Sequence, residues 1–279
     1  MCLFHYKMLI INLKSQIYLS LLPVNKSIKN RLRYFIELSY NGKAYHGWQN
    51  QPNATSVQEV LERALSTLLR VPIEIVGAGR TDAGVHAKQM FAHFDTDVAF
   101  LPEELTYKLN SFLPKCIAIH AIFEVPNNAH ARFDAISRSY SYKISLTKNV
   151  FDYNYSYNFK LPLDIEVMNK ACKVLFEYQD FKCFSRSNTD VKTYNCDIMK
   201  AEWVNENEML IFYITANRFL RNMVRAIVGT MIDVGLEKIS IEQFHEILKS
   251  KDRKKAGASV PGHALYLMNI EYPNYIVKK

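Results

Sequence analysis

Cysteine is scarce in this sequence and shows no pairing pattern. The five cysteines are odd in number and scattered, and none stands in a C-x-x-C arrangement. This spacing argues against a disulfide framework and against a zinc site, and it makes the cytoplasm the expected compartment. The eight histidines contain no H-x-x-x-H pair, and we interpret His86 with His93 as a pair on a sheet surface rather than a metal site.

Long apolar runs are missing as well. The two apolar stretches within residues 1–30 are short and interrupted by lysines, whereas a helix that crosses a bilayer needs about 20 apolar residues. No small-residue cleavage site of a signal peptide follows them. We expect no membrane association and treat residues 1–30 as an N-terminal extension of unassigned role, either a helix or the result of a mis-set start codon.

Acidic residues are outnumbered. Lys and Arg total 35 against 27 Asp and Glu, which gives a net charge of +8 and a pI near 9.1. This balance favours a polyanionic partner, and nucleic acid is preferred because no long amphipathic basic segment suits a membrane. Seventeen tyrosines and sixteen phenylalanines supply rings that can stack on unpaired bases, although most must form the core. The 49% hydrophobic content is enough for a sizeable core, in one large domain or two halves.

Glycine is sparse, yet three of the nine glycines fall within residues 77–84, the segment G-A-G-R-T-D-A-G. Clustered glycine indicates a backbone that adopts positive φ or approaches a ligand closely. Asp82 is the only acid in this loop, and the apolar segments on both sides predict strands. The loop is therefore expected to present Asp82 at the end of a sheet.

A plain hairpin turn competes with a functional loop here, because Gly and Asp are ordinary turn residues. The spacing does not match G-x-G-x-x-G, and no G-K-[ST] follows, so a phosphate-binding loop is disfavoured. Arg80 favours function, because a guanidinium two residues before Asp82 can lower the pKa of the carboxyl group and keep it anionic. An anionic, positioned carboxylate is what a nucleophile of this type requires.

The N-terminal half, residues 31–126, reads as α+β. Alternation over 31–40 predicts a strand closed by Asn-Gly, and Ser56 with Glu59 forms a capping box ahead of a helical stripe that ends at Leu69. The aromatic and polar segment 44–49 is expected to fold on the surface near the site. Further elements follow in order: a strand to about 94, a helix over 102–112 and a strand over 117–125. Turn composition at 126–130 marks the boundary.

The C-terminal half, residues 127–279, repeats this mixture. The predicted elements are a strand at 139–146, a helix at 162–178, strands at 194–204 and 208–216, helices at 217–229 and 241–248, and a strand at 265–272. Read as a helix, 217–229 places Arg218, Arg221 and Arg225 on one stripe, without an acid, where they suit phosphates or a partnership with Asp82. The basic loop 249–255 suits backbone phosphates. Tyr140 lies next to arginines and suits stacking on a flipped base.

Taken together, these segments resemble the tRNA pseudouridine synthase A (TruA) family. The resemblance rests on G-R-T-D-A-G-V-H-A at 79–87, A-R-F-D-A at 131–135, R-S-Y-S-Y at 138–142 and F-L-R-N-M-V-R at 219–225, and it runs from about residue 31 to 273. The first string is long and specific. The N-terminal extension is the main departure from the family.

The resemblance implies isomerisation of uridine to pseudouridine in the anticodon stem-loop of tRNA, at positions 38, 39 and 40, without cofactor or metal. It also implies a homodimer with an α+β fold, in which two similar halves form a continuous antiparallel sheet, flanked by helices, around a central basic cleft. Asp82 then matches the catalytic nucleophile. Tyr140 matches the tyrosine that packs on the base, Arg80 the arginine that helps to extrude it, and Arg225 the basic partner of the aspartate.

Two other function classes are open on the residues alone. A noncatalytic RNA-binding protein would keep the basic surface without using Asp82 for chemistry. A glycosidase would need a second acid near Asp82, for which Asp95 and Asp134 are available. Release of tritium from C5-labelled uridine separates the synthase from both.

Overall fold

The structure is a computed structural model that describes residues 31–186, 191–206 and 208–277. The N-terminal extension expected at residues 1–30 lies outside the described residues. The α-helices are α2 (Val57–Leu69), α3 (Pro102–Phe112), α4 (Ile165–Val174), α5 (Met223–Gly235) and α6 (Ile241–Ser250). Four short 3-10 helices complete the helical elements described, namely η1 (Gly42–Ala44), η2 (Leu175–Glu177), η3 (Lys182–Phe184) and η4 (Gly262–Ala264).

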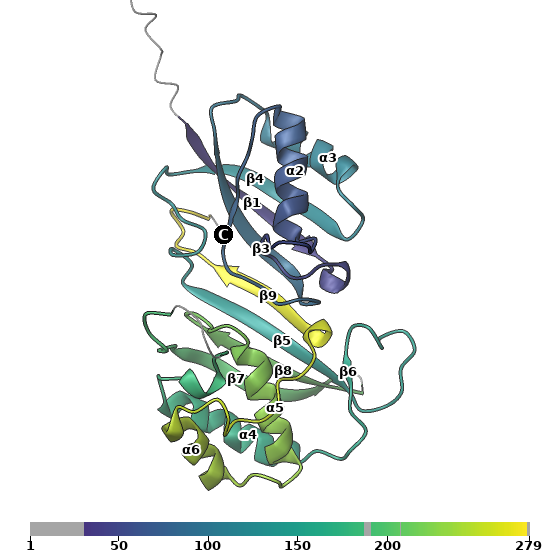
Figure 1. Cartoon of the computed structure of the whole chain (residues 1–279), viewed down its shortest axis with the longest axis vertical. Helices are drawn as coiled ribbons and strands as arrows, with labels where there is room; N and C mark the ends of the chain where they lie inside the picture. The colour runs from purple at the N-terminus through teal and green to yellow at the C-terminus, as the bar shows by residue number, and fades with distance from the viewer. Residues whose placement is uncertain (1–30, 187–190, 207, 278–279) are drawn as a thin grey trace, which may run out of the picture. The chain divides into compact units, whose positions relative to one another are not determined.

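The strands form one continuous sheet (Figure 1). They are β1 (Leu32–Tyr40), β2 (Val76–Gly77), β3 (His86–Thr96), β4 (Ile117–Val125), β5 (Ser137–Ser145), β6 (Tyr157–Asn158), β7 (Ile198–Glu206), β8 (Met209–Ala216) and β9 (Leu265–Glu271). Their order is β4-β1-β3-β9-β5-β8-β7, with β2 paired to β3 and β6 paired to β5. The expected α+β fold with a continuous sheet flanked by helices is confirmed.

The pairing of this sheet is mixed rather than purely antiparallel. Most neighbours are antiparallel, but β3 and β9 pair in parallel through His86 with Tyr266 and Ala87 with Leu267, and β5 pairs with β6 in parallel. The last strand reaches the sheet after α6 instead of through a hairpin, so no tight turn fixes its direction relative to β3. With its other neighbour, β5, β9 pairs antiparallel.

Local sequence explains the helix boundaries. The Ser56 side chain accepts a hydrogen bond from the Glu59 backbone N–H at the start of α2, as the capping signal predicts. Ser240 and Gln243 form a complete capping box at α6. α2 buries Leu61 and Leu65 against the sheet. Helix and sheet therefore share one apolar core, as the 3.6-residue spacing of the apolar side chains requires.

Two buried clusters lie along the sheet. The first joins β1, β3 and β4 with α2 and α3, and it includes Leu267 and Ile270 of β9. The second joins β5, β7 and β8 with α4, α5 and α6. Tyr140 of β5 packs against both clusters, so the seam between them runs beside this residue.

Candidate active site

Three residues with buried aromatic side chains form hydrogen bonds to the loop at 77–84. The Trp48 backbone N–H donates to the Thr81 carbonyl at 3.2 Å, and the Gly84 N–H donates to the Tyr45 carbonyl at 3.2 Å. Tyr40, at the end of β1, shares a hydrogen bond of 2.8 Å with the Thr81 hydroxyl. We call Tyr40, Tyr45 and Trp48 the floor of the site. Segment 44–49 was expected on the surface near the site, and this holds in part: Ala44, His46 and Gln49 are exposed, whereas Tyr45 and Trp48 are buried.

The three glycines of this loop serve different purposes. Gly84 adopts a φ of +77°, a conformation that L side chains rarely take. Gly77 lies against the indole of Trp48, where an added Cβ would stand 2.4 Å from ring atoms. A Cβ at Gly79 would meet nothing within 4 Å. The glycine cluster therefore reflects one turn and one close contact within the protein, while Gly79 faces open space.

Asp82 is paired with Arg225. Nη1 of Arg225 donates to Oδ2 of Asp82 at 3.0 Å, and both side chains are mostly buried, with exposed fractions of 21% and 26% respectively. Nε of Arg225 donates to the Val260 carbonyl at 2.7 Å. Arg225 lies in the first turn of α5. Its guanidinium is therefore fixed both by the helix and by the bond to the Val260 carbonyl. This arrangement holds the carboxylate in one orientation.

Arg221 reaches the same carboxylate from a different element than predicted. The prediction of one helix over 217–229 is wrong, because α5 begins at Met223 and Asn222 adopts a left-handed conformation with φ of 67°. Asn tolerates this conformation. A left-handed residue cannot be part of a right-handed helix, so α5 does not extend back beyond Met223. Arg221 therefore lies in the preceding loop, with Nε 4.0 Å from Oδ1 of Asp82 and a side chain that is 53% exposed. Arg218, Arg221 and Arg225 do not share a helical stripe.

Tyr140 lies within electrostatic range of Asp82. Burial raises the pKa of Tyr140 to about 12; Arg138 opposes the shift, and the Asp82 carboxylate adds to it. The ring of Phe219 meets the Tyr140 ring edge-on, with centroids 5.1 Å apart. The phenol is thus protonated at neutral pH and held by Phe219 from the side.

Arg80 belongs to an exposed group of cations. Burial lowers the pKa of Arg80, and the positive charges of Arg132 and Arg221 lower it further. Arg80, Arg132 and Arg221 are all exposed. Clustered, exposed guanidinium groups suit a polyanion. We call these three arginines the rim of the site.

Arg138 is a positioning residue that the sequence did not single out. Its Nη2 donates to the carbonyls of Ala78 at 3.1 Å and Arg132 at 2.5 Å, while its Nη1 donates to those of Ala135 and Asn217. Burial lowers the pKa of Arg138. One side chain thereby joins the loop of Asp82, the segment before β5 and the end of β8. In the sequence, Arg138 stands out only as a charged residue at the start of the alternating strand β5. That pattern does not reveal its hydrogen-bond partners.

The remaining basic residues named from the sequence have other surroundings. The charge of Arg218 helps to lower the pKa of Arg138, so the two groups lie within electrostatic range. In the 249–255 loop, Arg253 donates to the Ala256 and Gly257 carbonyls and to Ser259. Lys251 pairs with Asp180 at 2.8 Å. The four lysines of this loop are exposed, whereas Arg253 is partly buried, so most of its cations face solvent.

The two histidines of β3 are buried rather than paired on a surface. His86 accepts from the Gly42 N–H through Nδ1 and contacts the His263 carbonyl through Nε2. His93 accepts from the Ala131 N–H, and burial lowers its pKa to about 4. Each ring satisfies a backbone group, so the expected surface pair is wrong. In the part of the chain that the structure describes, no three His, Cys, Asp or Glu side chains gather as a metal would require.

The two acids considered as a second carboxylate are engaged elsewhere. Asp95 forms a salt bridge of 2.7 Å with Arg33, and Asp134 accepts from the His130 N–H at 2.7 Å. The charged groups that approach Asp82 most closely are two arginines. This geometry does not provide the paired carboxylates of a glycosidase.

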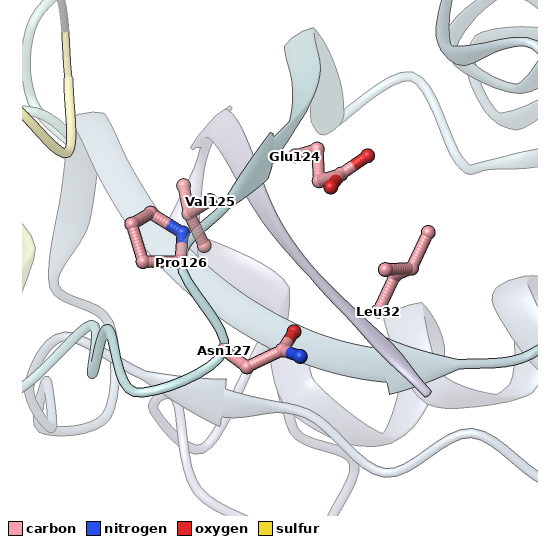
Figure 2. Close-up of a pocket in the computed structure, with 5 residues that line it drawn as sticks. All are labelled: Leu32, Glu124, Val125, Pro126 and Asn127. Carbon is pink, nitrogen blue, oxygen red and sulfur yellow. The ribbon is translucent and has the colours of Figure 1, made fainter. Parts of the chain in front are cut away.

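A hollow at the opposite end of β1 does not belong to this site (Figure 2). It is lined by Leu32, Glu124, Val125, Pro126 and Asn127. Leu32 begins β1, whereas Tyr40, which bonds to the loop of Asp82, ends it, a separation of roughly 26 Å at the usual rise of a strand. The hollow therefore has no contact with Asp82.

Comparison with known proteins assigns the chain to a family. The sequence model described as "tRNA pseudouridine synthase" matches residues 38–134 and 171–273. The chain is 54% identical over 248 residues to tRNA pseudouridine synthase A of Parabacteroides distasonis, covering 86% of this chain and 96% of that protein. It is 52% identical to the Bacteroides fragilis protein of that name, covering 88% and 98% of the two chains, and 37% identical to that of Francisella tularensis subsp. novicida, covering 88% and 96%.

The chain belongs to the tRNA pseudouridine synthase family. The enzymes of this family are isomerases, and the predicted resemblance is confirmed at this level. The matched ranges of the tRNA pseudouridine synthase family contain Arg80, Asp82 and Arg225, whereas Tyr140 falls between them. Among the described residues, no helix is long and apolar enough to cross a membrane.

Proposed function

We propose that this chain isomerises uridine to pseudouridine in the anticodon stem-loop of tRNA, at positions 38, 39 and 40, with Asp82 as the catalytic carboxylate. The observation that carries the proposal is the fixed pair of Asp82 and Arg225, 3.0 Å apart, in a loop that belongs to a segment matched by the family. The proposed activity needs no cofactor or metal.

The reaction exchanges one glycosidic bond for another. The bond between N1 of uracil and C1′ of ribose breaks, the base rotates, and C5 bonds to C1′. The proton on C5 leaves and N1 gains one, so the product is an isomer. Since the base is detached in between, it must leave the RNA stack and stay in the pocket.

The site residues have separate roles in this proposal. The Asp82 carboxylate attacks C1′ or C6, or removes a ribose proton, while the hydrogen bond from Arg225 holds it in one orientation. Tyr140 packs on the uracil, and its neutral phenol suits an uncharged base. Arg80, an exposed cation beside the loop, helps to extrude the target nucleotide.

The surrounding cations are proposed to set the position of the RNA. Arg218, Arg221 and the loop 249–255 contact backbone phosphates, which fix the register without reading sequence. We further propose that the two halves, residues 31–126 and 127–279, form a central basic cleft, and that the protein acts in the cytoplasm as a homodimer. Light scattering of the purified protein measures the dimer directly.

Tritium release tests the proposed function. Wild-type protein is incubated with unmodified tRNA that carries [5-³H]uridine, and pseudouridine is mapped at single-nucleotide resolution. We expect tritium in solvent and pseudouridine within positions 38–40. A matched tRNA with cytidine at those positions should release none.

Two results would contradict the proposal. Binding of tRNA without tritium release would favour a noncatalytic RNA-binding protein. Release from the cytidine-substituted tRNA would move the target outside positions 38–40.

A further inference from the structure

The turn that connects β4 to β5 can be followed in Figure 1. Within it, the ring of Phe133 is 73% exposed, although Ala129 and Ala131 of the same segment are buried. Its ring packs on one side against the imidazole of His130, with centroids 4.3 Å apart. The guanidinium of Arg132 lies 5.7 Å from the ring centroid.

This turn is rigid, so the exposure of Phe133 is imposed by the fold. Nδ1 of His130 accepts from the backbone N–H groups of Arg132 and Phe133, at 3.1 and 3.4 Å. The buried Ala131 donates to His93 and accepts from the Tyr272 hydroxyl. An exposed aromatic on an ordered backbone has already lost the conformational freedom that binding would otherwise remove.

The turn lies directly beside the catalytic loop. A single nitrogen, Nη2 of Arg138, donates to the carbonyls of both Ala78 and Arg132. Phe133 directly follows Arg132, whose carbonyl accepts from the same nitrogen as the Ala78 carbonyl in the loop of Asp82. Arg132 itself lies in this turn, and its charge and that of Arg221 act on Arg80 of the loop, so the exposed rim arginines lie within electrostatic range of one another here.

We propose that Phe133, with Arg132, forms a stacking platform for an unpaired nucleotide of the tRNA that neighbours the target uridine. Aromatic rings beside arginines bind single-stranded RNA by stacking on a base while the guanidinium groups meet the backbone. Phe133 positions the RNA and does not touch the reacting atoms. The inference rests on the proposed function, because it takes tRNA as the ligand.

Binding and fluorescence test the platform. tRNA affinity is measured in the Asp82→Asn background, so that turnover does not enter. Phe133→Ala should raise the Kd about five- to hundredfold, the range for loss of one base stack, without changing the salt slope of binding. Arg132→Gln should flatten that slope by about one unit. Tyr107→Ala is the matched control, since Tyr107 is an aromatic of similar exposure, 74%, on α3; its Kd should not change.

Phe133→Trp provides a second readout that tolerates failure of the alanine variant to fold. The native Trp48 and Trp203 are 2% and 3% exposed, so the new indole reports on the turn. We expect near-native affinity and quenching of its fluorescence by tRNA. An unchanged Kd for Phe133→Ala, an unquenched indole, or a loss of affinity that accompanies a changed oligomeric state would each overturn the platform. Tritium release by the wild type tests the proposed function separately.

Discussion

The floor of the site and its rim differ in how their side chains are held. Tyr40, Tyr45 and Trp48 are buried, and each contributes a side-chain or backbone bond to the loop of Asp82. Arg80, Arg132 and Arg221 are exposed and repel one another. The position of the carboxylate is therefore set by packing, whereas the exposed charges of the rim are free to meet a polyanion, as proposed for tRNA. Variants of the two regions should therefore fail in different measurements.

Arg225 connects the two regions, and its loss should have the largest effect. Arg225→Ala removes the bonds to Asp82 and Val260, so we expect kcat to fall about a hundredfold or more, as when a positioned electrostatic partner is lost. The Kd for tRNA should change much less. Arg225→Lys keeps the charge but cannot form both bonds, so its kcat should lie between those of the wild type and Arg225→Ala. Equal losses in kcat and binding would separate Arg225 from Asp82.

A substitution in the loop tests the packing of the floor. A Cβ at position 77 would stand 2.4 Å from the Trp48 ring, so Gly77→Ala should lower the free energy of unfolding by about 1–3 kcal/mol, as overpacking does. Urea denaturation measures it. Gly79→Ala is the control, because its Cβ meets nothing within 4 Å; its change should stay within about 0.5 kcal/mol. Equal effects would show that the indole does not constrain this loop.

The hydroxyl of Tyr40 tests a single bond of the floor. Tyr40→Phe leaves the Thr81 hydroxyl without its partner at 2.8 Å, and we expect a loss of about 1 kcal/mol in unfolding free energy. The salt dependence of tRNA binding should stay the same. Tyr213→Phe removes an exposed bond to Glu206 and should cost less. A changed salt slope for Tyr40→Phe would show that the floor also affects the ionic contacts with tRNA, which contradicts the separation of floor and rim.

The outer cations should give the smallest effect. Arg218→Ala and Lys254→Ala should each flatten the salt dependence of tRNA binding by about one unit of slope, because each removes one phosphate contact. The unfolding free energy should hardly change. Lys108, which pairs with Glu104 on α3, supplies the control variant Lys108→Ala. Unchanged slopes would place Arg218 and Lys254 off the RNA path.

Sequence alone predicted the elements whose signals are local. The alternation of β1 and the cap at Ser56 are examples, and Pro102 begins α3 as predicted. The start of α5 was not predicted, because Leu220 and Met223 keep helical spacing across the break at Asn222. The conformation of Asn222 is set by tertiary contacts such as its bond of 2.6 Å to Ser259, which no local pattern encodes.

The candidate site was predictable only in part. The glycine cluster located Asp82, but the reason for Gly77 is a tryptophan from another segment. The network of Arg138 joins residues up to 79 positions apart, and the burial of His86 and His93 depends on how β3 packs. Long-range packing of this kind leaves no periodic trace in the sequence, so these features required the structure.

The catalytic use of the Asp82 carboxylate is tested most directly by Asp82→Asn under single-turnover conditions, with enzyme in excess over [5-³H]uridine tRNA and binding verified. Asparagine keeps the size of the side chain and removes its charge. We expect tritium release to fall at least about a hundredfold while tRNA stays bound. Release at the wild-type rate from bound tRNA would contradict the account.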